Sequence, residues 1–150
     1  TRIPFIVVAP GYKAGQVCRR PVSLIDLYPT LTELCNLPAP THLQGESLIP
    51  LLRKPKSKRD PVLITYGKGN HAVRSEQYRY IRYANGEQEL YDLENDPEEI
   101  VNLSQNRKYT QQRNRLKGQL NQWIDDHDDP FYTYTTTPLK RDEAKTILKG

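Results

Sequence analysis

Apolar residues form a short, almost unbroken run near the start of the sequence. Residues 3–9 read Ile-Pro-Phe-Ile-Val-Val-Ala, and Pro10-Gly11 ends the run. A run of this length without polar alternation predicts a strand buried on both faces, as in a parallel sheet. Because one parallel strand needs neighbours to pair with, we expect these residues to belong to the end of a larger α/β domain.

The next apolar positions follow a helical spacing. They are Leu24, Leu27, Tyr28, Leu31, Leu34 and Cys35, and they predict a helix with one apolar face, capped at its start by Asp26 and ended by Asn36-Leu37-Pro38. Prolines, Gly45 and basic residues then predict an extended surface connection over residues 38–59, interrupted by the apolar patch 48–52.

From residue 61 the pattern changes to strands joined by tight turns. Residues 61–66, 72–83 and 89–93 predict three antiparallel strands, with turns at 67–70 and at Asn85-Gly86. After the break at Asn95-Asp96-Pro97, Ser104 is expected to cap a helix that covers this sheet. Its apolar face consists of Tyr109, Leu116, Leu120, Trp123 and Ile124, with Trp123 buried against the strands.

Three regions follow from this pattern. Residues 1–60 are expected to be the end of an α/β domain with its connection, and residues 61–126 a small α+β subdomain. Residues 127–150 carry few large apolar groups and are expected to be a weakly ordered tail.

Composition and charge exclude some classes of function. The formal net charge is +4, with an isoelectric point of about 9.0, which is too mild to favour nucleic-acid binding. No window approaches 18 apolar residues, so we expect neither a membrane span nor a membrane partner. The run Arg53-Lys54-Pro55-Lys56-Ser57-Lys58-Arg59 is typical of a solvated loop, and a docking patch for a polyanion is the alternative.

Few residues suggest chemistry by themselves. Cys18 and Cys35 have neither zinc-ligand spacing nor a redox-pair spacing, and the acidic residues 125–129 favour a solvated helix end over a cation site. Lys68, Asn70 and His71 lie in or beside the glycine-flanked turn 67–70. Their donors suit an anionic or hydroxyl-rich ligand, although an ordinary hairpin turn explains the same pattern.

Several ordered motifs resemble one enzyme family. They are residues 2–11 (RIPFIVVAPG), 22–31 (VSLIDLYPTL), 43–52 (LQGESLIPLL), 72–83 and 89–103, the last reading ELYDL…DPEE…NL. Together they resemble the C-terminal portion of sulfatases, the sulfuric ester hydrolases with an alkaline-phosphatase-like fold, and most resemble bacterial iduronate-2-sulfatase-like enzymes.

The resemblance implies an α/β fold, in which the last strand and helix of an alkaline-phosphatase-like sheet precede a small antiparallel subdomain with a covering helix. It also implies a formylglycine made within a Cys/Ser-x-Pro-Ser-Arg motif and a divalent metal, usually calcium. That motif is absent from these residues. We therefore expect the catalytic and metal-binding residues to lie in an upstream catalytic domain of the same chain, and this fragment alone to be inactive.

The remaining expectations concern ligand, place and partners. By the resemblance, the substrate is a sulfated saccharide, with Lys68, Asn70 and His71 at the rim of its pocket, and the protein is secreted or periplasmic. Two other classes stay open on the residues alone. One is a polyanion-binding module that uses residues 53–59, and the other is a structural or interaction domain without a ligand.

Overall fold

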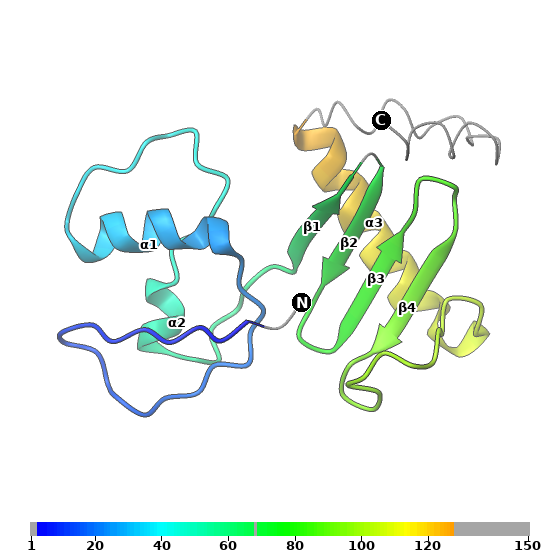
Figure 1. Ribbon diagram of the computed structural model, residues 1–150, viewed down its shortest axis with the longest axis horizontal. Helices are drawn as coiled ribbons and strands as arrows, with labels where there is room; N and C mark the ends of the chain where they lie inside the picture. Colours follow the sequence, from blue (N-terminus) through cyan, green and yellow to red (C-terminus); the bar gives the residue numbers. More distant parts are fainter. Residues whose placement is uncertain (1–2, 68, 128–150) are drawn as a thin grey trace. The chain divides into compact units, whose positions relative to one another are not determined.

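The computed structural model of the chain describes residues 3–67 and 69–127. The chain divides into two compact units, Thr1–Asp60 and Pro61–Gly150. The first unit contains the 3₁₀ turn η1 (Leu24–Asp26) and the helices α1 (Leu27–Leu34) and α2 (Ile49–Arg53). The second contains four strands, followed by a 3₁₀ turn and a longer helix (Figure 1).

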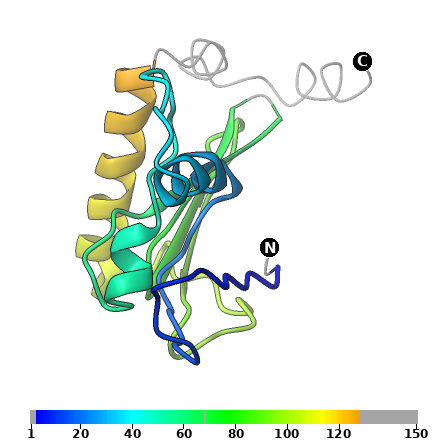
Figure 2. The same ribbon diagram turned by 90° about the vertical axis from the view of Figure 1, so that its left-hand side faces the viewer.

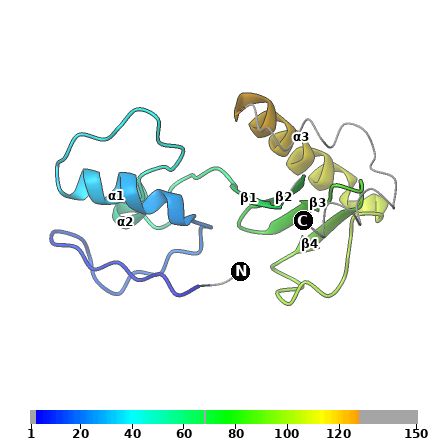
Figure 3. The same cartoon turned by 45° about the horizontal axis from the view of Figure 1, so that its top comes forward.

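Residues 3–9 do not form the strand that their sequence predicts. They are extended chain without a strand partner in the described part of the molecule, and Ile6 and Val8 are 86% and 94% exposed. Figures 1 and 3 show this dark-blue segment beside α2, with no strand along it. A strand exists only through hydrogen bonds to a neighbour, so the apolar sequence without that neighbour leaves extended, solvated chain.

Helix α1 forms where it was predicted, but its buried face is the opposite one. Leu24, Tyr28 and Leu31 are more than half exposed, whereas Asp26, Thr30 and Thr32 are buried with Pro29. The hydroxyls of Thr30 and Thr32 donate to main-chain oxygens within the helix, which satisfies them inside the unit. An apolar helix face in water is unusual for a complete domain.

The second unit is built on a four-stranded antiparallel sheet in the order β1-β2-β3-β4. The strands are β1 (Val62–Tyr66), β2 (Asn70–Arg74), β3 (Tyr78–Arg82) and β4 (Gln88–Asp92). The single strand predicted over residues 72–83 is therefore wrong. Ser75 turns the chain there, because its hydroxyl donates to the Tyr78 carbonyl and accepts from the Tyr78 N–H.

Helix α3 (Thr110–His127) covers one face of the sheet, as Figure 2 shows where the green strands are seen nearly edge-on. Its predicted cap at Ser104 is wrong: η2 (Arg107–Tyr109) precedes it, and the Asn106 side chain accepts the Lys108 N–H. The core between helix and sheet consists of Val73, Tyr78, Tyr80, Leu90, Leu116, Leu120 and Ile124. Trp123 packs at the edge of this core and is only partly buried, whereas the sequence predicts a buried side chain.

Candidate functional site

The turn between β1 and β2 carries the three residues that the sequence singled out. Lys68 lies outside the described residues. Asn70 is half-buried, and its side-chain oxygen accepts the Ala84 N–H at 3.0 Å. His71 is 1% exposed, with its Nδ1 3.3 Å from the Thr65 hydroxyl oxygen. Asn70 and His71 thus fix the base of the turn, and ligand contact by the three residues stays a prediction.

The buried side of β2 and β3 ends in polar groups near this turn. Alternation along the strands puts His71 on the same face as Val73, which packs in the core below α3. Arg82 is the register partner of His71, and its guanidinium donates to the Asn121 side-chain oxygen of α3 at 3.0 Å. This polar end holds helix and sheet together. No local spacing in the sequence indicates it, because Arg82 and Asn121 are 39 residues apart.

The other face of the sheet carries tyrosines and charges. The Glu89 carboxylate accepts from the hydroxyls of Tyr83 and Tyr91 at 3.2 and 3.0 Å. Burial, together with the hydrogen bond to Glu89, raises the pKa of Tyr91 to about 12, and burial and the negative Glu89 also raise the pKa of Tyr83. Both hydroxyls are therefore neutral donors at any physiological pH, which suits structure and not proton transfer.

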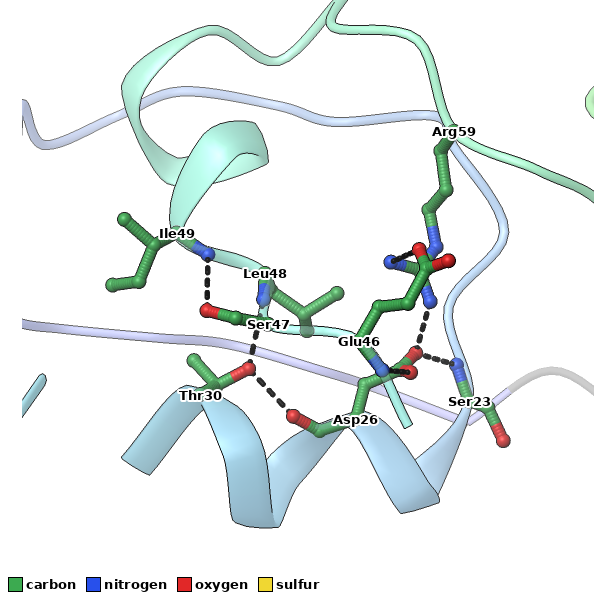
Figure 4. Close-up of polar contacts among 8 residues, drawn as sticks. All are labelled: Ser23, Asp26, Thr30, Glu46, Ser47, Leu48, Ile49 and Arg59. Carbon is green, nitrogen blue, oxygen red and sulfur yellow. Dashed lines mark hydrogen bonds and ion pairs between the residues drawn. The ribbon is translucent and has the colours of Figure 1, made fainter. Parts of the chain in front are cut away.

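The densest polar cluster in the first unit surrounds Asp26, just before α1 (Figure 4). Asp26 is 2% exposed, and its carboxylate accepts the N–H groups of Ser23 at 2.7 Å and Glu46 at 2.9 Å. The same carboxylate lies 2.5 Å from the Arg59 guanidinium. Asp26 does not cap α1 through its side chain, contrary to prediction; it holds together three segments that are distant in the sequence.

Thr30 and Gly45 complete the Asp26 cluster. The Thr30 hydroxyl donates to the Asp26 carbonyl and accepts the Leu48 N–H at 2.9 Å, which ties the start of α2 to α1. Gly45 passes directly over the backbone of Ile25, where a β-carbon would collide with the Ile25 carbonyl. The motifs 22–31 and 43–52 therefore fit each other closely, and Asp26 and Thr30 have structural roles within this unit.

Arg59 leaves the basic run that the sequence grouped together. Its side chain is 8% exposed and is bound by Asp26 and by Glu46 at 3.2 Å, so it is not part of a polyanion patch. Arg53, Lys54, Lys56 and Lys58 are exposed.

Within residues 3–67 and 69–127, no three potential metal ligands of the His, Cys, Asp or Glu type lie together. Cys18 and Cys35 are exposed thiols. No helix in this described part is long and apolar enough to cross a membrane. Asp128 and Asp129 of the acidic run, and the predicted tail from residue 128 on, lie outside the described residues.

Comparison with known proteins decides what this arrangement belongs to. Residues 1–126 match the family described as N-sulphoglucosamine sulphohydrolase, C-terminal. The chain belongs to this family of sulfatase C-terminal domains.

Curated relatives of this sulfatase C-terminal domain carry sulfatase names. A sulfatase of Formosa agariphila is 37% identical over 121 residues, which cover 80% of this chain and 24% of the relative. Human arylsulfatase K is 31% identical over 118 residues, covering 68% of this chain and 22% of the enzyme. The chain thus spans about a quarter of the length of these relatives.

Solved structures agree with the fold. A 2-O GAG sulfatase superposes with a TM-score of 0.63 at 31% identity, over 72% of this chain and 26% of its own. A second neighbour, solved with D-glucosamine-2-N,6-O-disulfate as its substrate, has a TM-score of 0.63 over 71% of this chain and 25% of its own; at 24% identity it shows the fold alone. The alkaline-phosphatase-like α+β assignment is confirmed.

Residues 89–103, the last of the sequence motifs that resemble sulfatases, make structural contacts within this C-terminal domain. The N–H groups of Val101 and Ile100 donate to the Asp96 carboxylate and hold its pKa below the ordinary value. Asn102 accepts the Leu90 N–H, so the chain after β4 continues along that strand. Glu99 pairs with Arg79 of β3 at 2.8 Å. Asp96, Asn102 and Glu99 of this motif therefore hold the chain after β4 against the sheet.

Proposed function

We propose that the protein to which this chain belongs hydrolyses sulfate esters of sulfated saccharides. The family match over residues 1–126 carries this proposal, because the domain occurs in sulfatases. The sulfatase of Formosa agariphila and the 2-O GAG sulfatase, both above 30% identity, support it independently. The 2-O GAG specificity named for the second protein also favours an iduronate-2-sulfatase-like preference for 2-O-sulfates.

In this proposal, the groups that break the ester bond lie outside these 150 residues. The family's formylglycine and calcium need a Cys/Ser-x-Pro-Ser-Arg motif and a set of carboxylate and amide ligands. Neither Cys18-Arg19-Arg20-Pro21 nor Cys35-Asn36-Leu37-Pro38 has that motif, and the described residues do not fit a metal. We therefore assign catalysis to an upstream catalytic domain of the same protein.

The role assigned to this chain is to shape the substrate opening. Ligands of α/β sheets bind outside the carboxyl ends of the strands, where neighbouring loops form the rim. The turn 67–70 is suited to such a rim, since Asn70 and His71 anchor its base by the contacts to Ala84 and Thr65. We assign Lys68 of this turn to a sulfate or carboxylate of the sugar, because an ammonium group forms charge-assisted hydrogen bonds with such anions.

The rim is tested in the complete protein by replacing Lys68 with alanine. Loss of one hydrogen bond to a charged group is worth about 1.5–3 kcal/mol, or about 10- to 150-fold in kcat/KM. We expect this loss on a sulfated oligosaccharide and little change on a small aryl sulfate, which does not reach the rim. Lys108→Ala, on an exposed residue before α3, is the control.

Three results would contradict the proposal, two of them the role of Lys68 and one the sulfatase assignment. Equal losses on both substrates would place Lys68 at the sulfate itself, and no loss on either would leave the turn an ordinary hairpin. Failure of the complete protein to release sulfate from any sulfated saccharide or aryl sulfate would overturn the sulfatase assignment. A secreted or periplasmic location is part of the same proposal and is checked by fractionating the source cells.

A further inference from the structure

Two segments of the first unit are joined side by side by hydrogen bonds from side chains of one to main-chain oxygens of the other. The Gln16 side chain donates to the Leu52 carbonyl at 3.1 Å, and the Cys18 thiol to the Pro55 carbonyl at 3.3 Å. The Arg20 guanidinium donates to the Lys56 carbonyl at 3.2 Å. Residues 16–20 and 52–58 therefore form one continuous surface, although more than 30 residues separate them in the sequence.

This surface concentrates positive charge. We call it the basic strip; its cations are Arg19, Arg20, Arg53, Lys54, Lys56 and Lys58. All but Arg20 are exposed, and the five exposed cations form no ion pair with a carboxylate of the described residues. Asp26 and Glu46, two of the four acidic residues within residues 1–60, are already held by Arg59. The basic strip thus keeps nearly its full charge.

We infer that the basic strip binds the sulfated polysaccharide chain that carries the substrate ester. This inference rests on the proposed function, which makes such a polyanion the molecule that the protein meets. Several closely spaced cations attract a polymer with repeated sulfates far more than a single sulfated sugar, because each contact releases a counterion. The strip would hold the polymer near the enzyme between cleavage events.

The side chains of the strip favour a polysaccharide over a nucleic acid. Proteins that bind single-stranded nucleic acid combine cations with aromatic side chains, on which the bases stack. Residues 16–20 and 52–58 contain no aromatic residue. A sulfated sugar offers sulfates and hydroxyls and no base to stack, so lysines and arginines on exposed chain suffice for it.

The test measures heparin binding by the complete protein as a function of salt, with heparin as the sulfated polysaccharide. The variant K54Q/K56Q/K58Q removes three exposed lysines of the strip. The control R107Q/K108Q/K117Q removes the same charge from exposed residues at and after η2. Log K falls as log salt rises, and in the strip variant we expect this negative slope to become shallower by about two to three. Heparin binding near 0.15 M salt should be at least tenfold weaker. The control should change both values little.

Three further outcomes decide between explanations. Equal losses in the strip variant and the control would overturn the inference, since net charge alone would then explain binding. A single-stranded DNA of equal charge that binds as tightly as heparin, and loses as much in the strip variant, would also overturn it. Normal heparin binding through the strip in a protein that releases no sulfate would support the strip while refuting the proposed function.

Activity provides an independent readout. In the strip variant, kcat/KM is expected to fall at least fivefold on the polymer and to stay unchanged on a small aryl sulfate, because an aryl sulfate offers no further sulfates for the strip to bind. An unchanged value on the polymer at low salt would overturn the inference. Thermal unfolding of both variants should match the parent, since none of the replaced lysines or arginines is buried.

Discussion

The guanidinium of Arg59 lies 2.5 Å from the carboxylate of Asp26, across 33 residues of sequence, and both side chains are almost fully buried. This pair joins the residue just before α1 to the end of the first unit. Only Asp60 separates Arg59 from Pro61, so the pair fixes the point at which the first unit ends.

Breaking this pair should destabilise the protein strongly. Arg59→Gln leaves the Asp26 carboxylate buried without its cation, and removal of one partner of a buried pair costs about 3–5 kcal/mol. We expect a lower urea midpoint for the complete protein. Lys58→Gln, at an exposed neighbour, is the control and should lie within about 0.5 kcal/mol of the parent. A midpoint for Arg59→Gln equal to that of Lys58→Gln would show that the pair contributes no net stability.

Gly45 and Gly118 should respond in opposite directions to alanine. At Gly45 a β-carbon would meet the Ile25 carbonyl, so Gly45→Ala must push α2 away from η1 and is expected to destabilise by about 1–3 kcal/mol. Gly118 lies in α3 with open space around it, and there Gly118→Ala should stabilise by up to about 1 kcal/mol. Equal midpoints for the two variants would contradict the close approach at Gly45.

The Tyr91 hydroxyl should ionise near pH 12, and ultraviolet absorbance measures this titration. Because its folded-state pKa is above the ordinary value of 10.0, its contribution to stability is complete below pH 10 and is lost as the pH rises through about 12. Glu89→Gln should lower the pKa of Tyr91 toward 10 without reaching it, since burial is the larger cause. A Tyr91 that ionises near pH 10 in the parent would refute the Glu89 contact.

The isolated 150-residue chain should self-associate. Its first unit exposes Ile6, Val8, Leu24, Tyr28 and Leu31, an apolar surface that water does not stabilise. Light scattering after size exclusion is expected to give masses above the 17.4 kDa of a monomer, and Leu24→Gln with Leu31→Gln should reduce them. A soluble monomer at about 0.1 mM with a sharp thermal transition would count against this expectation.

The sequence predicted the second unit better than the first for a physical reason. The strands 61–66 and 89–93, the Asn85-Gly86 turn and the helix through Leu116 and Leu120 all follow local spacing, and the unit contains its own core. The error at Ser75 came from a turn without glycine or proline. In the first unit, residues 3–9 and the stripe through Leu31 read as buried, whereas in this chain they are exposed.

Site prediction failed where contacts join distant segments. Asp26 was read as a local helix cap and Arg59 as one cation of a solvated run, and no spacing rule connects them. Ligand contact by His71 stays a prediction. The glycines before it do not indicate its burial, whereas strand alternation turns it to the buried face. Alternation over residues 71–74 was too short to show this before the register with β3 was known.

The contacts that assemble the basic strip also bear on how its sequence can change. Leu52, Pro55 and Lys56 each contribute only a main-chain oxygen to them. Every residue type has a main-chain oxygen. A mutation at any of these three positions that adds or removes a lysine therefore leaves the hydrogen bonds between the two segments in place. Selection can therefore retune the charge of this surface to polymers of different sulfate density one substitution at a time, without repacking the unit that carries it.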